Sequence, residues 1–201
     1  MRLYSMPSSG NSYKVRLLLA LTGRDCPRVD VEYGSPALEA AHREGRLPFG
    51  KAPVLEVEPG VMLAESNAIL CWLGEGGPFW PADPLERARM MAWMFWEQNQ
   101  HEGVIAVRAA LVTYPHRAAE ATPERMAALL EAGHRLLGVM EAHLDGRDWL
   151  VGAGPSLADI CLYAYTHKAG CRGGFAMDRF PAIGAWLDRV AGLPGYVGLD
   201  D

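Results

Sequence analysis

The sequence predicts a mixed α/β part with the element order βαβα and then ββα, followed by an all-helical part. Three observations predict this division. Short apolar segments with strand patterns alternate with helical patterns up to about residue 74. A stretch rich in Gly and Pro then runs from Gly74 to Pro84. Beyond it, every periodic segment has the spacing of a helix.

The first elements are a strand, a polar turn and a helix. Residues Arg2 to Ser5 have a strand pattern, and Pro7 to Ser12 are typical of a turn. From Tyr13 the apolar spacing is helical until Gly23 ends the helix. A strand therefore enters a helix through a serine-rich turn.

This turn contains Ser8, Ser9, Asn11 and Ser12. A polar side chain near a helix N-terminus can hold an anion such as a thiolate, because hydrogen bonds and the helix dipole favour negative charge there. The alternative is that these side chains only cap the helix, and we expect Asn11 or Ser12 in that role.

The α/β part continues with a strand, a short helix, a hairpin and a third helix. These elements are expected at Arg28–Glu32, at Ser35–Arg46, at Pro53–Val57 with Val61–Leu63, and from Glu65 onwards. The hairpin strands are separated by a Pro-Gly pair, which is a turn signal.

Pro53 opens a predicted strand, which needs an explanation. Proline in a sheet is confined to an edge or to a place where the backbone bonds something else. If the bond from Ala52 to Pro53 is cis, the backbone N–H and carbonyl of Ala52 can pair with an extended peptide ligand. The alternative is an ordinary trans proline at the start of the strand.

Glu65 and Ser66 lie where the third helix begins. The unpaired N–H groups of a first turn can bind a carboxylate, while a Glu side chain can bind an ammonium group. This combination suits the α-carboxylate and α-amine of an amino acid. The alternative is a capped surface helix.

Four helical segments are expected in the second part. They are Leu85 to about Thr113, bent or broken near Gly103; Pro123–Leu144 with Thr122 as its N-cap; Ser156–Lys168; and Pro181–Ala191. Ser156 and Asp159 have the spacing of a capping box, so we expect Asp159 to stabilise the fold rather than to catalyse.

Composition excludes several classes of protein. Half of the residues are apolar, 21% are charged and the formal net charge is −5, which does not favour nucleic acid as a partner. No stretch approaches the ~20 apolar residues of a membrane span, so we expect a cytoplasmic protein. The four cysteines lack CxxC spacing, and no repeated His, Cys or Asp pattern predicts a metal; we expect free thiols at Cys26, Cys71, Cys161 and Cys171.

Four blocks in order resemble the cytosolic glutathione transferases, particularly bacterial members with serine or asparagine at the active site. The blocks begin at Ser9, Phe49, Glu65 and Ser156, and read SGNSYKVR, FGKAPVL, ESNAI and SLADI. The resemblance covers essentially the whole chain. It implies a thioredoxin-like domain at 1–77, a linker at 78–83 and an all-helical domain at 84–201 that contributes an electrophile pocket and a dimer interface.

The resemblance also implies glutathione as the cosubstrate and a role for each matching residue. Glu65 and Ser66 would hold the γ-glutamyl group, and the backbone of Ala52, ahead of a cis Pro53, would pair with the cysteinyl part. Lys51 would face the glycine carboxylate, where the family often has glutamine; it could equally be a solvated loop lysine.

Ser9 matches the catalytic serine of the family, and Asn11 is the second candidate as an amide donor to the sulfur. Ser8 precedes Ser9 directly, so a shift of one residue in the match would exchange the two. The expected activity is conjugation of glutathione to small hydrophobic electrophiles. The alternatives are glutathione-dependent reduction of disulfides or peroxides, and an interaction module without catalysis.

The segment from Met90 to Trp96 is too apolar for one exposed face, and most of it is expected in the core. The resemblance implies that this helix also joins a homodimer interface and borders the electrophile pocket. Candidates for the wall of that pocket are Trp96, Gln100, His101, Tyr163 and Tyr165.

Overall fold

The computed structural model describes residues 1–201, which form two compact units. The first contains residues 1–80 and 193–201, and the second contains residues 81–192. Residues 193–201 were predicted to belong to the helical part. In the structure these last residues pack on the first unit, because Tyr13 Oη donates to the Val197 carbonyl at 2.7 Å and Arg16 donates to the Leu199 carbonyl at 3.0 Å.

The first unit has the predicted order βαβα then ββα. Its strands are β1 (Arg2–Ser5), β2 (Arg28–Asp30), β3 (Val54–Glu58) and β4 (Val61–Ala64), and its helices are α1 (Gly10–Leu21), α2 (Pro36–Arg43) and α3 (Ser66–Gly74). The strands form one sheet in the order β2-β1-β3-β4. β1 and β2 are parallel, whereas β3 is antiparallel to both β1 and β4. The α/β prediction is confirmed.

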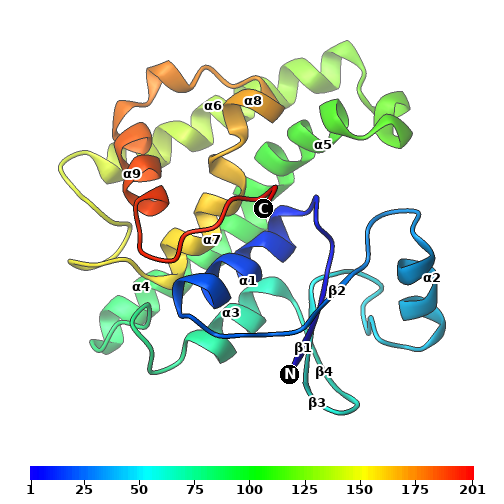
Figure 1. The fold of residues 1–201 in the computed structure, drawn as a ribbon. Coiled ribbons are helices and arrows are strands. Elements are labelled where there is room, and N and C mark those ends of the chain that lie inside the picture. Colours follow the sequence, from blue (N-terminus) through cyan, green and yellow to red (C-terminus); the bar gives the residue numbers. More distant parts are fainter. The chain divides into compact units, whose positions relative to one another are not determined.

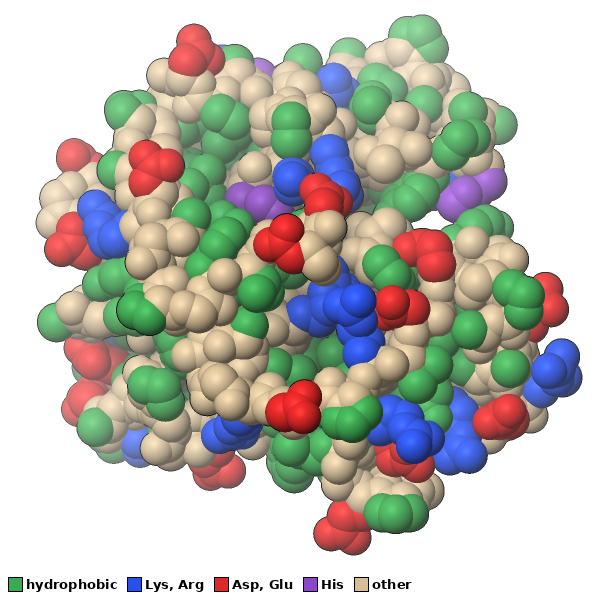
Figure 2. Space-filling model, viewed as in Figure 1, with side chains coloured by type: hydrophobic (Ala, Val, Ile, Leu, Met, Phe, Trp, Pro, Cys, Tyr) green, Lys and Arg blue, Asp and Glu red, His purple; other side chains and the backbone are tan.

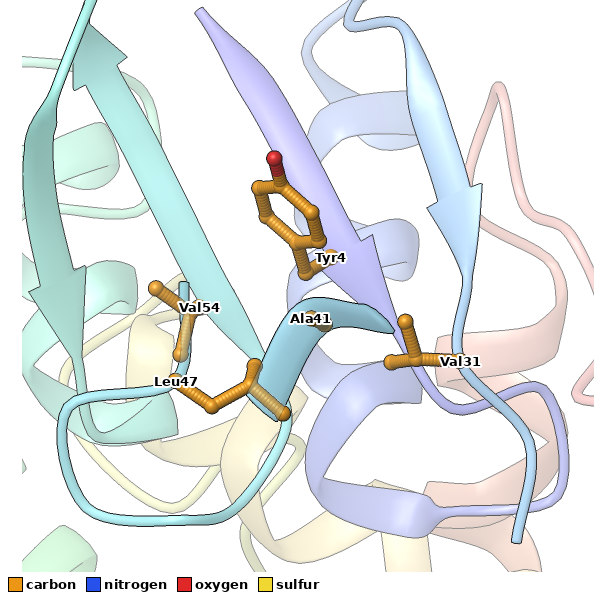
Figure 3. Packing of buried hydrophobic residues seen from close by; sticks show 5 residues of the cluster. All are labelled: Tyr4, Val31, Ala41, Leu47 and Val54. Atoms are coloured by element: carbon orange, nitrogen blue, oxygen red, sulfur yellow. The ribbon is translucent and has the colours of Figure 1, made fainter. Parts of the chain in front are cut away.

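Helices cover both faces of this sheet. Figure 1 shows α1 and α3 together on one side of the strands and α2 on the other. Side chains alternate along a strand, so Leu3 and Tyr4 of β1 face opposite layers. Tyr4 belongs to the cluster on the α2 side, shown in Figure 3, which consists of Tyr4, Val31, Ala41, Leu47 and Val54.

The start of α1 differs from the prediction. The helix begins at Gly10, and its N-cap is Ser9, whose backbone is extended and whose Oγ accepts from the Ser12 N–H at 3.4 Å. The prediction that Asn11 or Ser12 caps the helix was wrong, because both lie within its first turn. Ser12 Oγ instead accepts from the Met6 N–H at 3.0 Å.

The second unit contains only helices and loops. Its helices are α4 (Pro84–Trp96), the π-helical η1 (Glu97–Ala106), α5 (Val107–Thr113), the 3₁₀ segment η2 (Pro115–Glu120), α6 (Pro123–Leu144), α7 (Leu157–Thr166), α8 (Ala169–Gly173), the 3₁₀ segment η3 (Met177–Arg179) and α9 (Pro181–Ala191). No helix combines the length and apolar character needed to cross a membrane.

The bounds of α6 and the Thr122 cap agree with the prediction, since Thr122 accepts from the Arg125 N–H at 3.3 Å. The long segment expected from Leu85 to Thr113 is interrupted over ten residues by η1, which includes Gly103. The prediction missed α8 and the two 3₁₀ segments, because pieces of three to six residues carry too little periodicity to be recognised.

Charges of both signs are mixed on the face of the molecule shown in Figure 2, where acidic and basic side chains lie among one another. Large apolar side chains also reach the surface. In the second unit the most exposed are Leu85, Phe95, Val112 and Val139, with Phe95 at 72%.

Candidate functional site

The loop between β1 and α1 presents two adjacent serines in different environments. The Ser8 hydroxyl donates to Glu32 Oε1 at 2.9 Å, and the Ser8 N–H donates to Glu32 Oε2 at the same distance. The Ser9 hydroxyl accepts from the first turn of α1 and donates to no protein acceptor. Ser9 is half-buried, so its hydroxyl proton is available to a ligand at the helix N-terminus.

The loop before these serines is held by Arg16, a buried residue of α1. Its guanidinium donates to Ser5 Oγ at 2.9 Å, to the Met6 carbonyl at 3.3 Å and to the Pro7 carbonyl at 3.0 Å. Burial lowers the pKa of this arginine. Arg16 was not predicted from the sequence to take part in the site. The available signal was an arginine between Val15 and Leu17, where its neighbours are apolar.

The N-termini of α1 and α3 are joined by side chains. Ser66 Oγ donates to Asn11 Oδ1 at 3.2 Å, and the buried Lys14 donates to Asn67 Oδ1 at 3.4 Å. Residues 55 positions apart in the sequence thus meet at one place. Lys14 is a second residue of this region that was not predicted from the sequence.

Glu65 has the one non-glycine backbone with positive φ, at φ 70° and ψ 115°. This conformation costs roughly 1–3 kcal/mol and is typical of functional sites. Its side chain is exposed and makes no capping hydrogen bond to α3. The arrangement is therefore not a capped surface helix.

The segment before β3 contains the other residues expected near glutathione. The bond from Ala52 to Pro53 is cis, so the trans alternative was wrong. Pro53 is buried, Ala52 is half-buried, and the Lys51 side chain is exposed. β3 pairs with both β1 and β4, so this segment leads into the centre of the sheet.

The five residues expected around an electrophile pocket all lie in the second unit, but in different surroundings. His101 is buried in η1 beside Trp96 of α4, with 5.7 Å between ring centroids, and its Nε2 is 3.1 Å from Thr166 Oγ1. Gln100 is exposed, whereas Tyr163 is buried and stacks on His167 at 4.8 Å.

Tyr165 is half-buried on α7. A cavity of about 590 Å³ within the second unit is lined by none of these five residues. Its lining comes from α4, the end of α6 and the following loop: Arg89, His143, Gly146, Arg147, Asp148, Trp149, Leu150, Val151, Gly152 and Ala153.

Ser156 and Asp159 form a buried capping box at the start of α7. The Asp159 carboxylate accepts from the Ser156 N–H at 2.8 Å, from the Ser156 hydroxyl at 2.9 Å, from the Leu150 N–H at 3.0 Å and from Trp186 Nε1 at 2.9 Å. Burial raises the pKa of this carboxyl, while these hydrogen bonds oppose the shift. All four donors to this carboxylate are groups of the protein, as expected for a residue that stabilises the fold.

The thiols of Cys26 and Cys71 are poorly suited to act as nucleophiles. Burial is the main cause that raises the pKa of Cys26 and of Cys71, and a thiol with a raised pKa is less ionised at neutral pH. No three His, Cys, Asp or Glu side chains are grouped so that they could hold a metal ion.

Comparison with known proteins gives matches over most of the chain. A family profile described as "Glutathione S-transferase, N-terminal domain" matches residues 3–78, and one described as "Glutathione S-transferase, C-terminal domain" matches residues 104–194. A maleylacetoacetate isomerase of Pseudomonas aeruginosa is 30% identical over 98% of this chain and 93% of that protein.

Two further similarities bear on the reaction and the fold. The disulfide-bond oxidoreductase YfcG of Escherichia coli is 26% identical over 96% of this chain and 90% of that protein. A crystal structure described as a possible glutathione S-transferase from Rhodopseudomonas palustris has a TM-score of 0.93 at 38% identity, covering 100% of this chain and 98% of that one.

Proposed function

Because the chain belongs to the glutathione S-transferase family, we propose that it binds glutathione and conjugates its sulfur to small hydrophobic electrophiles. The observation that carries this proposal is the hydrogen bond from Ser66 to Asn11. This bond joins the N-terminus of α3, which suits a carboxylate, to the N-terminus of α1, which presents Ser9. One extended tripeptide can therefore contact both N-termini.

Glu65 and Ser66 bind the γ-glutamyl group in this proposal. The Glu65 carboxylate pairs with the ligand's ammonium group, while the first turn of α3 and Ser66 donate to its α-carboxylate. The strained backbone and uncommitted side chain of Glu65 support this role, because strain of this kind persists where function requires it.

The segment before β3 binds the rest of the tripeptide. The backbone of Ala52, ahead of Pro53, pairs with the cysteinyl part as an added strand would. Lys51 is exposed and faces the glycine carboxylate in this proposal, where a surface charge pair contributes little beyond orientation.

Ser9 activates the sulfur in this proposal, with Asn11 as the second polar contact. Lowering a thiol pKa by two units from about 8.5 requires roughly 2.7 kcal/mol of preferential stabilisation of the thiolate. One hydrogen bond to a charged group supplies about 1.5–3 kcal/mol, and a helix dipole adds about 0.3–1 kcal/mol. These two contributions suffice without a general base.

The second unit supplies the electrophile pocket, with Trp96, Gln100, His101, Tyr163 and Tyr165 as its proposed wall. A second copy of the chain is the proposed partner, because α4 exposes Leu85 and Phe95 on its surface. Light scattering during size-exclusion chromatography should therefore give twice the mass of one chain.

Substitution of the two serines tests the assignment of the sulfur contact. Ser9→Ala should lower kcat/KM for conjugation of glutathione to chlorodinitrobenzene at least tenfold, while Ser8→Ala, its matched control, should change it little. The Ser8 hydroxyl already donates its proton to Glu32, so we expect it not to donate to the sulfur. A defect in Ser8→Ala together with a normal Ser9→Ala would contradict the proposal.

Glutathione-dependent reduction of disulfides or peroxides is the second candidate reaction. The similarity to a disulfide-bond oxidoreductase supports it. In this reaction Asn11, which accepts from Ser66, would act together with Ser9. Turnover of hydroxyethyl disulfide in preference to chlorodinitrobenzene would favour this reaction. Failure to show a glutathione-induced thermal shift would instead favour an interaction module without catalysis.

A further inference from the structure

The last nine residues, 193–201, form a tail that lies along α1. The tail approaches the helix closely at Gly195, where φ is +84° and a Cβ would lie 2.8 Å from the Ala20 carbonyl oxygen. Further along, Tyr13 Oη donates to the Val197 carbonyl at 2.7 Å, and Leu199 is buried. The tail is therefore an ordered part of the first unit.

Arg16 joins this tail to the loop that carries the two serines. One nitrogen of its guanidinium, Nη2, donates both to the Leu199 carbonyl and to the Pro7 carbonyl, each at 3.0 Å. The other, Nη1, donates to Ser5 Oγ and to the Met6 carbonyl. The rigid planar fork of an arginine can hold these acceptors in one fixed arrangement, which a lysine cannot reproduce.

The Met6 carbonyl connects this arrangement to Ser9. It accepts from the Ser9 N–H at 3.1 Å as well as from Arg16, so movement of this carbonyl would move the Ser9 backbone. The Met6 N–H in turn donates to Ser12 Oγ. The position of the Ser9 hydroxyl thus depends on a chain of contacts that begins at the tail.

We propose that Arg16 is a positioning residue for Ser9 in the glutathione site. The tail contributes to the same site, because its Leu199 carbonyl helps to hold Arg16 in place. This inference rests on the proposed function. Arg16 acts through the loop and does not touch the sulfur. Its effect on the glutathione thiol should therefore require Ser9 to be present.

A double-mutant cycle on the bound thiol tests this directly. The thiolate absorbance of the glutathione-saturated protein is followed against pH in wild type, Arg16→Gln, Ser9→Ala and the double variant. Each single substitution should raise the pKa of the bound thiol by about one unit, since one charge-assisted hydrogen bond is lost or misplaced. The double variant should show no further rise.

Arg16→Lys separates positioning from charge. If position matters, the lysine variant should behave like Arg16→Gln, because it keeps the charge and loses the fork. A wild-type thiol pKa in Arg16→Lys would overturn the positioning role, because charge alone would then suffice. Additive pKa shifts in the cycle would also overturn it, because a direct effect of charge on the thiolate persists without Ser9.

Gly195→Ala provides a variant that leaves Arg16 unchanged and displaces the tail. It should raise the thiol pKa in the same direction, whereas Gly138→Ala, at an open helical position, should not. A normal thiol pKa in Gly195→Ala would exclude the tail from the site. Calorimetry that detects no glutathione binding by wild type would overturn the proposed function itself; binding with an unaltered pKa in Arg16→Gln would overturn only this inference.

Discussion

Serine is the N-cap of α1, α2 and α7, and the N-termini of α1 and α7 differ in how fully their polar atoms are used. At α7, Ser156 and Asp159 are buried, and the carboxylate accepts four hydrogen bonds. At α1, Ser9 is half-buried, the one hydrogen bond of its side chain to the helix is long at 3.4 Å, and its hydroxyl proton has no protein acceptor.

The difference supports a stabilising role for the start of α7 and, in our proposal, a ligand-binding role for the start of α1. A buried polar group must be satisfied within the protein, since leaving it unpaired costs about 1–3 kcal/mol. A partly exposed group at a helix N-terminus can instead keep its donor for an anion. The stabilising and the ligand-binding role therefore differ in whether the polar atoms at the N-cap all have protein partners, and not in the presence of a serine.

Removal of the Asp159 carboxylate should have the largest effect on stability. Asp159→Ala leaves four buried donors without their acceptor, so we expect a loss of at least about 3 kcal/mol in the free energy of unfolding. Urea titration followed by circular dichroism measures it. A variant with a normal melting temperature and no activity would contradict the structural role.

Matched alanine substitutions at the two serines should give the next largest effect and test the comparison most directly. Ser156→Ala should cost about 1–2 kcal/mol of unfolding free energy, because a buried cap and a donor to Asp159 are lost. Ser9→Ala should cost less than about 1 kcal/mol, given its long contact. Equal losses in the same denaturation assay would break the comparison.

Substitution of Glu120 should have the smallest effect on stability, because its carboxylate is fully exposed. Hydrogen bonds from Arg117 and Arg125 lower the pKa of Glu120 to about 2. Since the folded pKa is depressed, any stabilisation is present above the unfolded pKa of about 4.3 and is lost as pH falls toward about 2.

Glu120→Gln should therefore shift the melting temperature at pH 7 by less than Ser156→Ala does, and the shift should disappear in acid. Melting curves recorded between neutral and acidic pH measure both. A large shift that persists at low pH would contradict the small contribution expected from ion pairs of an exposed carboxylate.

Much of the fold followed from local patterns in the chain. The strand and helix order of the first unit and the bounds of α6 were predicted because their apolar periodicity and end signals agree. The cap of α1 was misassigned, because Ser9, Asn11 and Ser12 are all good capping residues and only the extended backbone of Ser9 distinguishes them.

The candidate site was predictable only in part. Glu65 and Ser66 were identifiable as a helix start, but the contact between Ser66 and Asn11 joins residues 55 positions apart. Arg16 was missed because an arginine within an apolar helical pattern gives no sign of which carbonyls it will meet.

By itself, the sequence determined the element order, the chemistry of the helix starts and the resemblance that points to glutathione, because these depend on neighbouring residues and on spacing. Only the tertiary structure decided that Ser8 is committed to Glu32, that Ser9 is the cap with a free proton, and that the tail returns to α1. Those outcomes depend on which distant groups satisfy each other's hydrogen bonds, and local sequence does not encode that pairing.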